Sequence, residues 1–399
     1  MNEEKPFEKQ TLFWIVLSSL INEPLFIMYG FSTMILRKDF GVDEFTIACF
    51  VSMKPIVSIL SYYWGAHLQE RPDLVKRNFL LASILGRVLF LGLPLFPYPS
   101  FLILASTLYI LFYRAAKPAW IEMLRINTTK EKKQTAFSWG VALGYLEGMV
   151  LAVLLGGLLD RGPFYWSYLF AFCALVSLLG IYAISYLPVA CADHKKGTIF
   201  VKNPWKKLQH LLDTRKDFAK FQWGFMLCGF GLMFIQPAIT LVVVDVLDLS
   251  YVRFGLAYTS WKGICIALSS PIWSKLLQRF SIFSLSSWIF LFASLLPLCL
   301  FFSPFHILWL YVGYIFYGIA QGGSQLVWNI SGPVFSKGEN SAQFTATNVL
   351  MIGVRGLIAP FLGAVFVKGF GPFAALFVGA LICLLGAVYI APSRLEAPA

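Results

Sequence analysis

Charged residues are scarce in this 399-residue sequence. They make up 13% of it, whereas hydrophobic residues make up 58%, and the mean hydropathy is +0.72. A soluble globular chain is typically about one quarter charged, so a water-soluble fold of this size would lack the charges to cover its surface. The composition therefore excludes most soluble classes and predicts that lipid surrounds much of the chain.

Metal-ligand and disulfide patterns are also missing. The seven cysteines stand singly, mostly inside apolar runs and without a CxxC pair, and none of the four histidines has a ligand-spaced partner. This spacing argues against a disulfide framework and against a zinc site. No HExxH, P-loop or GxGxxG motif stands at a membrane boundary. We therefore expect no cofactor and no enzyme activity, and a membrane-embedded enzyme or sensor is the least favoured class.

Long apolar runs are what the sequence has instead. A membrane-spanning helix needs about 20 apolar residues, and such runs predict an all-α membrane protein with twelve transmembrane helices. The predicted spans are residues 12–36, 45–67, 79–96, 100–124, 136–159, 165–188, 220–244, 254–275, 282–302, 305–330, 342–367 and 371–391. No small-residue cleavage site closes the first run, so it is expected to be a retained helix rather than a signal peptide.

The basic residues distinguish the two sides of the predicted membrane. The loops on one side are rich in basic residues and contain Arg71, Lys76, Arg77, Arg125, Lys130, Lys132, Lys133, Lys275, Arg279 and Lys337. The opposite loops contain Arg37, Lys38, Arg161, Arg253 and Lys368. The positive-inside rule then predicts a multi-pass protein of the cell (inner) membrane with both termini cytoplasmic. The same placement explains the net charge of +12 without a nucleic-acid partner.

One long polar stretch divides the spans into two sets of six. We predict an N-terminal six-helix bundle over 1–188, a basic cytoplasmic linker over 189–219 and a C-terminal six-helix bundle over 220–399. The lysines of the linker are interpreted as a topology signal. Binding of its lysine-rich face along an anionic inner leaflet is the alternative.

The two halves also repeat each other in sequence, which is typical of many transporters. The matching segments are 53–61 with 261–269, Glu23-Pro24 with Gln236-Pro237, and Phe112-Tyr113 and Ala116-Lys117 with Phe316-Tyr317 and Ala320-Gln321. Each half has six spans, so both halves enter the membrane in the same orientation. Parallel repeats of this kind place a binding site between the halves near the midplane. The pattern predicts a carrier of a small solute.

Across essentially its whole length, the chain resembles the major facilitator superfamily. The segment from Gly65 to Arg71 is similar to a degenerate form of the family's G-x-x-x-D-R-x-G-R-[RK] gating loop, with Gln69 or Glu70 where the family has Asp. The segment 114–118 is similar to the family's R-x-x-Q-G motif. The resemblance implies alternating access, with the first, fourth, seventh and tenth helices lining a central cavity.

Ionisable residues inside the predicted spans are the candidate functional residues, because charge in lipid is costly and usually faces a cavity or a partner. The candidate solute-binding residues are Arg114, Lys117, Lys54, Lys262, Arg355, Gln321, Gln325 and Asn348. Glu23 and Glu147 are the candidates for carrying a coupling proton. For each of them the alternative is a structural role in fixed contacts between helices.

The candidate bases outnumber the candidate acids, which favours an anionic solute such as a carboxylate or a phosphorylated metabolite. We expect a monomeric secondary transporter in the bilayer, working as a proton symporter or an anion antiporter by alternating access. Its expected partners are a small-molecule solute, lipid, and protons or another coupling ion. The alternative is a proton-coupled exporter of neutral or cationic amphiphiles, in which the acids carry the function.

Overall fold

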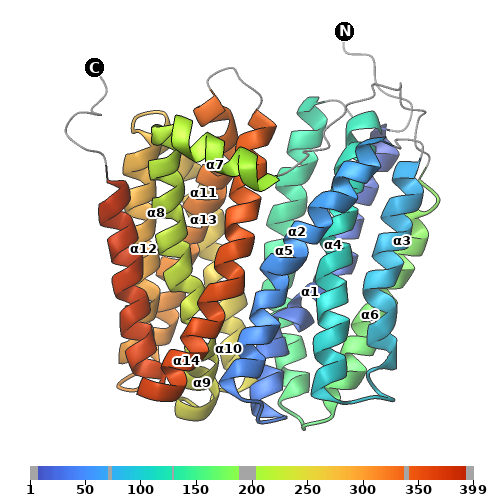
Figure 1. Cartoon of the computed structure of the whole chain (residues 1–399). Helices are drawn as coiled ribbons and strands as arrows, with labels where there is room; N and C mark the ends of the chain where they lie inside the picture. Colours follow the sequence, from blue (N-terminus) through green and yellow to red (C-terminus); the bar gives the residue numbers. More distant parts are fainter. Residues whose placement is uncertain (1–7, 71–73, 128–129, 188–203, 337–340, 392–399) are drawn as a thin grey trace. The chain divides into compact units, whose positions relative to one another are not determined.

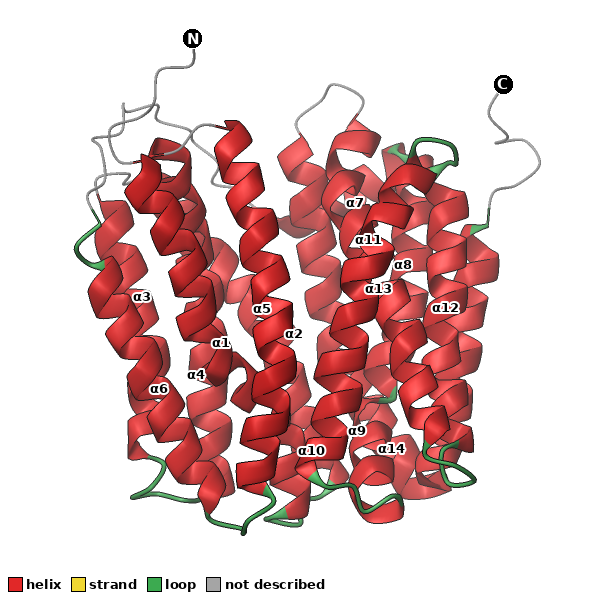
Figure 2. Ribbon diagram, turned by 180° about the vertical axis from the view of Figure 1, so that it is seen from behind, coloured by secondary structure: helices red, strands yellow, loops and turns green. Residues whose placement is uncertain are grey.

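The computed structural model describes residues 8–70, 74–127, 130–187, 204–336 and 341–391. Within these ranges every regular element is a helix, as Figure 2 shows. The first half of the chain forms α1 (Glu8–Lys38), α2 (Glu44–Glu70), α3 (Val75–Val88), the 3-10 turn η2 (Leu89–Gly92), α4 (Pro99–Asn127), α5 (Lys130–Leu159) and α6 (Tyr165–Ile184).

The second half of the chain is divided into more pieces. Its elements are α7 (Pro204–Thr214), α8 (Lys216–Phe234), α9 (Gln236–Leu241), the π-helical η3 (Val242–Val246), α10 (Tyr251–Gly255), the π-helical η4 (Leu256–Trp261), α11 (Lys262–Leu277), α12 (Ile282–Phe302), α13 (Leu308–Ser336) and α14 (Ser341–Ile390). The described residues of the predicted spans lie mainly in these helices, and the last two spans, 342–367 and 371–391, both lie in α14.

Six helical segments of the described chain are long and apolar enough to cross a membrane. They are Lys9–Lys38, Pro99–Lys117, Tyr165–Ile184, Lys216–Val246, Ile282–Phe302 and Thr347–Ile390. The all-helical membrane class is therefore confirmed. Twelve separate crossings stay a prediction.

Two helix breaks coincide with glycine or proline residues. Gly371 has φ 83° and ψ 166°, which interrupts α14 where the sequence predicts a boundary between two spans. Only glycine adopts such a conformation readily, and Pro372 follows it directly. The predicted single span 220–244 is instead interrupted after Phe234. There Pro237 has no N–H to donate to the preceding turn.

The contacts among residues divide the chain into two compact units. Unit 1 comprises Met1–Phe40, Val57–Phe200 and Ser250–Gly255; unit 2 comprises Gly41–Ile56, Val201–Leu249 and Leu256–Ala399. Each unit consists mainly of one half of the chain and includes one short segment of the other half. The domain boundaries predicted from the sequence stay a prediction.

Unit 1 is tied together by the buried Arg87 of α3. Its Nε donates to Ser177 Oγ at 2.5 Å, its Nη1 to the Ser83 carbonyl at 2.7 Å, and its Nη2 to Asn22 Oδ1 at 2.7 Å. These bonds join α3 to α1 and α6. A hydrogen bond to a charged group contributes about 1.5–3 kcal/mol to stability. The guanidinium of Arg87 therefore stabilises the packing of α3 against α1 and α6.

The segment Ser250–Gly255 is held in unit 1 by α5. Asp160, directly after α5, accepts hydrogen bonds from the main-chain N–H of Tyr251 at 2.8 Å and of Val252 at 3.2 Å. A Cβ at Gly156 would lie 2.9 Å from the Val252 nitrogen. The backbones of α5 and α10 therefore touch, which requires glycine at this position.

Unit 2 is built around the packing of α8 against α14, with α12 on α13 and α14 (Figure 1). Glycines permit the close approach of α8 and α14. A Cβ at Gly231 would lie 2.7 Å from the Gly379 carbonyl oxygen, and one at Gly386 would lie 2.8 Å from the Cys228 nitrogen. Small residues at helix contacts are what packing in lipid requires, because there the hydrophobic effect does not drive helices together.

Candidate functional site

Two acidic side chains of unit 1 lie close together. Glu23 is on α1 and Glu147 is on α5, and these two helices pack on each other. A Cβ at Gly144, one turn before Glu147, would lie 3.8 Å from Glu23 Oε2, and the two carboxylates repel each other electrostatically. Glu147 Oε2 is buried without a hydrogen-bond partner among the described residues. Either carboxylate can therefore take up or release a proton. No ion pair that the structure describes would be broken by this change.

A tyrosine cluster borders this acidic pair. The ring centroids of Tyr29 and Tyr109 lie 5.8 Å apart, those of Tyr109 and Tyr113 5.9 Å apart, and those of Phe26 and Tyr113 6.1 Å apart. Tyr113 is also close enough to Glu23 to interact with it electrostatically. Helices α1 and α4 therefore place aromatic rings next to the acids, and the tyrosine rings among them carry hydroxyl groups.

The two candidate bases of α4 lie beside the same cluster. Arg114 is half-buried and close enough to Tyr29 and Tyr113 to interact with them electrostatically. Lys117, one turn further along α4, is exposed, and its charge repels that of Arg114. Unit 1 thus has phenol groups close to the acids and to Arg114, with Tyr113 near both Glu23 and Arg114.

Unit 2 holds Arg355 in a different setting. Only 6% of Arg355 is exposed, and its Nη1 donates to the Phe225 carbonyl of α8 at 2.8 Å. Its Cζ lies 5.8 Å from the centroid of the Phe225 ring, and its guanidinium leaves no room for a Cβ at Gly229. The Nε atom is buried without a hydrogen-bond partner among the described residues. The buried guanidinium of Arg355 therefore has one N–H donor, at Nε, that the described residues leave without an acceptor.

Lys262 is a second base of unit 2, and it is half-buried. Its Nζ lies 3.6 Å from the centroid of the Tyr258 ring, one turn earlier, in a cation–π contact. Tyr258 packs edge-on against Tyr314 at 5.9 Å. On the same helix as Tyr314, Gln321 Nε2 donates to the Tyr317 hydroxyl at 3.1 Å. This second cluster contains a base, phenol groups and an amide.

The remaining predicted residues are less closely grouped. Asn348 is buried and donates to Ser331 Oγ at 2.8 Å, while its Oδ1 has no hydrogen-bond partner among the described residues. Gln325 and Lys54 are exposed. Gly65, Gln69 and Glu70 lie in the last turns of α2, whose side chains are not among those described, and Arg71 lies outside the described residues.

The tyrosines near the charges are not among the residues that the sequence predicts for the site. A usable signal was present, because Tyr113 precedes Lys117 by four residues, Tyr258 precedes Lys262 by four, and Tyr317 precedes Gln321 by four. Residues four apart share a helix face. Within the described ranges, no three His, Cys, Asp or Glu side chains group as metal ligands would.

Comparison with known proteins identifies a family. A family model described as Major Facilitator Superfamily matches residues 12–332, and no curated protein matches the sequence. A variant of the nucleoside transporter NupG superposes with a TM-score of 0.75 at 14% identity, covering 95% of this chain and 98% of that one.

Transporters of the POT family share the same architecture. The structure of one in complex with 5-aminolevulinic acid superposes with a TM-score of 0.71 at 13% identity, covering 93% of this chain and 94% of that one. For PepTSo the TM-score is 0.72 at 10% identity, with 96% and 97% covered. At these identities the likeness shows the fold.

Proposed function

Because the chain belongs to the major facilitator superfamily, we propose that the solute it transports is a small organic anion and that protons drive the transport. Family membership makes it an integral multi-pass membrane transporter of the secondary kind and not an enzyme. What remains to be proposed is the solute, the coupling and the residues that perform both.

The setting of Arg355 and Lys262 carries the proposal for an anion. In unit 2, Arg355 is buried and contacts a carbonyl, and Lys262 is half-buried and contacts a ring. Burial of a charge is costly unless it is paired. An anionic solute supplies the missing charge, and the unused Nε donor of Arg355 offers it a charge-assisted hydrogen bond. Gln321 and Asn348 add neutral donors or acceptors.

Glu23 and Glu147 support the proposal for proton coupling. Two carboxylates within repulsive range in a low-dielectric medium are stabilised when one of them takes a proton. An incoming anion brings negative charge, so a proton taken up by this pair keeps the loaded carrier near neutral. Arg114 and Lys117 lie in the same unit as the acids and belong with the solute-binding bases in this scheme.

The solved relatives are named for small polar solutes. NupG is a nucleoside transporter, and the POT-family structures are complexes with a thioalcohol-conjugated peptide or with 5-aminolevulinic acid. We infer a solute of similar size for this chain. Alternating access, a gating role for Gly65 to Arg71, location in the inner membrane and cytoplasmic termini belong to the same proposal, supported by the repeat and the loop charges.

The rival function is proton-coupled export of neutral or cationic amphiphiles. One observation favours it, because the acidic pair lies beside the rings of Phe26, Tyr29 and Tyr113. Such rings attract cations and apolar groups. The two functions differ in which charged residues they require. Export of a cation requires the acids and tolerates loss of Arg355.

A thermal-shift screen of the purified full-length protein tests the choice. Matched compounds that differ in charge, such as carboxylates with their amides and phosphorylated metabolites with their parent alcohols, are added over a concentration series. A ligand at about 100 times its Kd stabilises the folded state by about 2.7 kcal/mol. We expect anions to raise the Tm and their neutral partners to leave it unchanged. A set of hits confined to neutral or cationic compounds would refute the anion proposal.

A further inference from the structure

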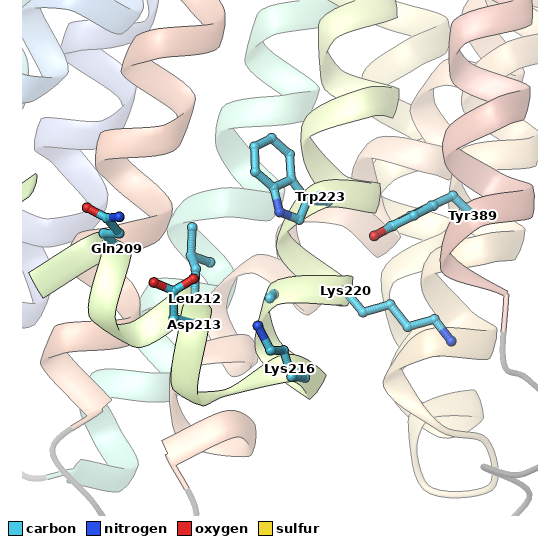
Figure 3. A pocket seen from close by; sticks show the side chains of 8 residues that line it. Gln209, Leu212, Asp213, Lys216, Lys220, Trp223 and Tyr389 are labelled. Atoms are coloured by element: carbon cyan, nitrogen blue, oxygen red, sulfur yellow. The ribbon is translucent and has the colours of Figure 1, made fainter.

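A pocket opens in unit 2 between α7, the start of α8 and the end of α14. Its volume is about 460 Å³, and its lining residues include Gln209, Leu212 and Asp213 of α7, Lys216, Lys220 and Trp223 of α8, and Tyr389 of α14, as Figure 3 shows. It lies apart from the buried bases and acids described above, none of which is among its lining residues.

The position of α7 follows from its amphipathic sequence. Leu208 is buried, and Leu211 and Leu212 pack on the hydrophobic core of unit 2, whereas Gln209 and His210 face outward. The helix crosses the direction of α8 at that end of unit 2 (Figure 1). A short helix with one apolar face and one polar face is suited to the boundary between water and lipid.

One face of α8 supplies a charged stripe that continues into an aromatic one. Lys216, Lys220 and Trp223 are spaced by four and three residues, so they lie along the same side of the helix. Lys216 is exposed, and the Nζ of Lys220 lies 5.4 Å from the centroid of the Phe283 ring. Both lysines stand in the first turns of α8, where the helix dipole adds positive potential.

The charge balance of the pocket is positive. Asp213 is the acid among its lining residues, against the ammonium groups of Lys216 and Lys220. The neighbouring Arg215 is occupied elsewhere, because it pairs with Asp217 at 3.3 Å and donates to the Phe335 carbonyl. The charge balance of the pocket therefore suits an anionic group.

The aromatic end of the pocket faces outward. Trp223 is 49% exposed and Tyr389 is 46% exposed, and their rings stand on the two sides of the pocket beyond the lysines (Figure 3). Trp and Tyr with such exposure are typical of the headgroup level of a bilayer, where one end of the ring is apolar and the other wet. A soluble anion would not need these rings.

We propose that this pocket binds the headgroup of an anionic phospholipid. The phosphate lies between Lys216 and Lys220, and the glycerol and upper acyl chains run along Trp223 and Tyr389 into the membrane. The lysines then supply the charge recognition and the rings supply the apolar contact. This site is independent of the proposed solute and of proton coupling.

Lipid binding to the full-length protein in detergent tests the proposal. Phosphatidylglycerol and phosphatidylcholine with identical acyl chains are titrated, with the Tm and lipid adducts in native mass spectrometry as readouts. We expect phosphatidylglycerol to raise the Tm and to form a one-lipid adduct at concentrations where phosphatidylcholine does neither. Equal binding of the two lipids would overturn the proposal, as would an equal effect of inorganic phosphate alone, which would indicate a soluble anion.

Variants locate the site. Lys216→Gln with Lys220→Gln should weaken phosphatidylglycerol binding at least tenfold, because each base near an anionic surface contributes substantially to lipid attraction. Lys275→Gln with Arg279→Gln, at exposed positions of unit 2, is the matched control and should bind normally. Lys216→Arg with Lys220→Arg should retain binding, which separates loss of charge from loss of folding. Undiminished binding by the Gln variant, or by either single variant if the double does not fold, contradicts the assignment.

Discussion

The two units treat buried charge in different ways. In unit 1, Glu23 and Glu147 lie together, and Tyr113 is close to both Glu23 and Arg114. In unit 2, Arg355 is buried and Lys262 is half-buried, and the acids that the structure describes lie only in loops or near helix ends. These acids are Asp43, Glu44, Asp213, Asp217, Asp245 and Asp248.

The sequence repeat makes this difference informative, because it shows which residues stand at matching positions of the two halves. Glu23 corresponds to Gln236, the first residue of α9, which donates to the Leu232 carbonyl of α8 at 3.1 Å. Lys117 corresponds to Gln321, and the same alignment places Gly318 opposite Arg114. Under the proposed function, unit 1 contributes the proton-coupling acids together with Arg114 and Lys117, and unit 2 contributes the buried Arg355.

The largest expected effect comes from removing the acids of unit 1. In Glu23→Gln with Glu147→Gln, no carboxyl of the pair can take up a proton. We expect accumulation of the anion found by thermal shift, driven by a pH gradient in proteoliposomes, to fall at least tenfold, while exchange of internal for external solute continues. Glu44→Gln in unit 2 is the control. Accumulation that survives in the double variant would place the coupling elsewhere.

The next effect comes from changing the shape of a base in unit 2 without changing its charge. Arg355→Lys removes the planar donor set and the hydrogen bond to the Phe225 carbonyl. A charge-assisted hydrogen bond contributes about 1.5–3 kcal/mol, so we expect Kd for the anion to rise by roughly 10- to 100-fold. Arg279→Lys, at an exposed position, should leave Kd unchanged. Normal affinity in Arg355→Lys would assign Arg355 a purely structural role.

A third effect probes the glycine that stands opposite Arg114 in the repeat. A Cβ at Gly318 would lie 2.5 Å from the Lys262 carbonyl oxygen and 2.7 Å from Cys265 Cβ, whereas a Cβ at Gly369 meets nothing within 4 Å. Overpacking costs about 1–3 kcal/mol, so Gly318→Ala should lower the Tm by several degrees. Gly369→Ala should leave it unchanged or raise it slightly. Equal values of the Tm would show that α11 and α13 do not pack so closely.

The smallest effect compares one aspartate from each unit, both outside the membrane spans. Burial raises the pKa of Asp39 to about 6, against the weaker opposing effects of Tyr251 and Lys38. Hydrogen bonds from Thr46, including its main-chain N–H at 3.0 Å, lower the pKa of Asp43. Ionisation therefore disfavours the folded state at Asp39 and favours it at Asp43.

The signs of the pH dependence follow by linkage. A raised pKa means that the folded state binds the proton more tightly, so the contribution of Asp39 to stability is lost as pH rises from about 4 to 6. Asp39→Asn should flatten this decline in a series of Tm measurements. Asp43→Asn should not, because the carboxylate of Asp43 is already ionised over that range. A wild-type decline that persists in Asp39→Asn would assign it to another group.

The positions of the helices could be predicted because hydropathy is a local property. The span predicted at 282–302 coincides with α12, and the break predicted between 367 and 371 lies at Gly371. The interruption after Phe234 was not predicted, although Pro237 was noted in the repeat. A proline does not by itself break a helix, as α1 shows by continuing through Pro24. Neighbouring helices decide which prolines are accommodated.

The sequence by itself determined that this chain is helical and membrane-embedded, and which charges lie within its spans, because these properties depend on residues near one another in the chain. Only the tertiary structure decided what each charge contacts. It joined Glu23 to Glu147, enclosed Arg355 beside Phe225 and secured Arg87 to Ser177. The two residues of each pair are about one hundred positions apart in the sequence. A contact between helices so far apart along the chain is determined by the packing of side chains and backbones.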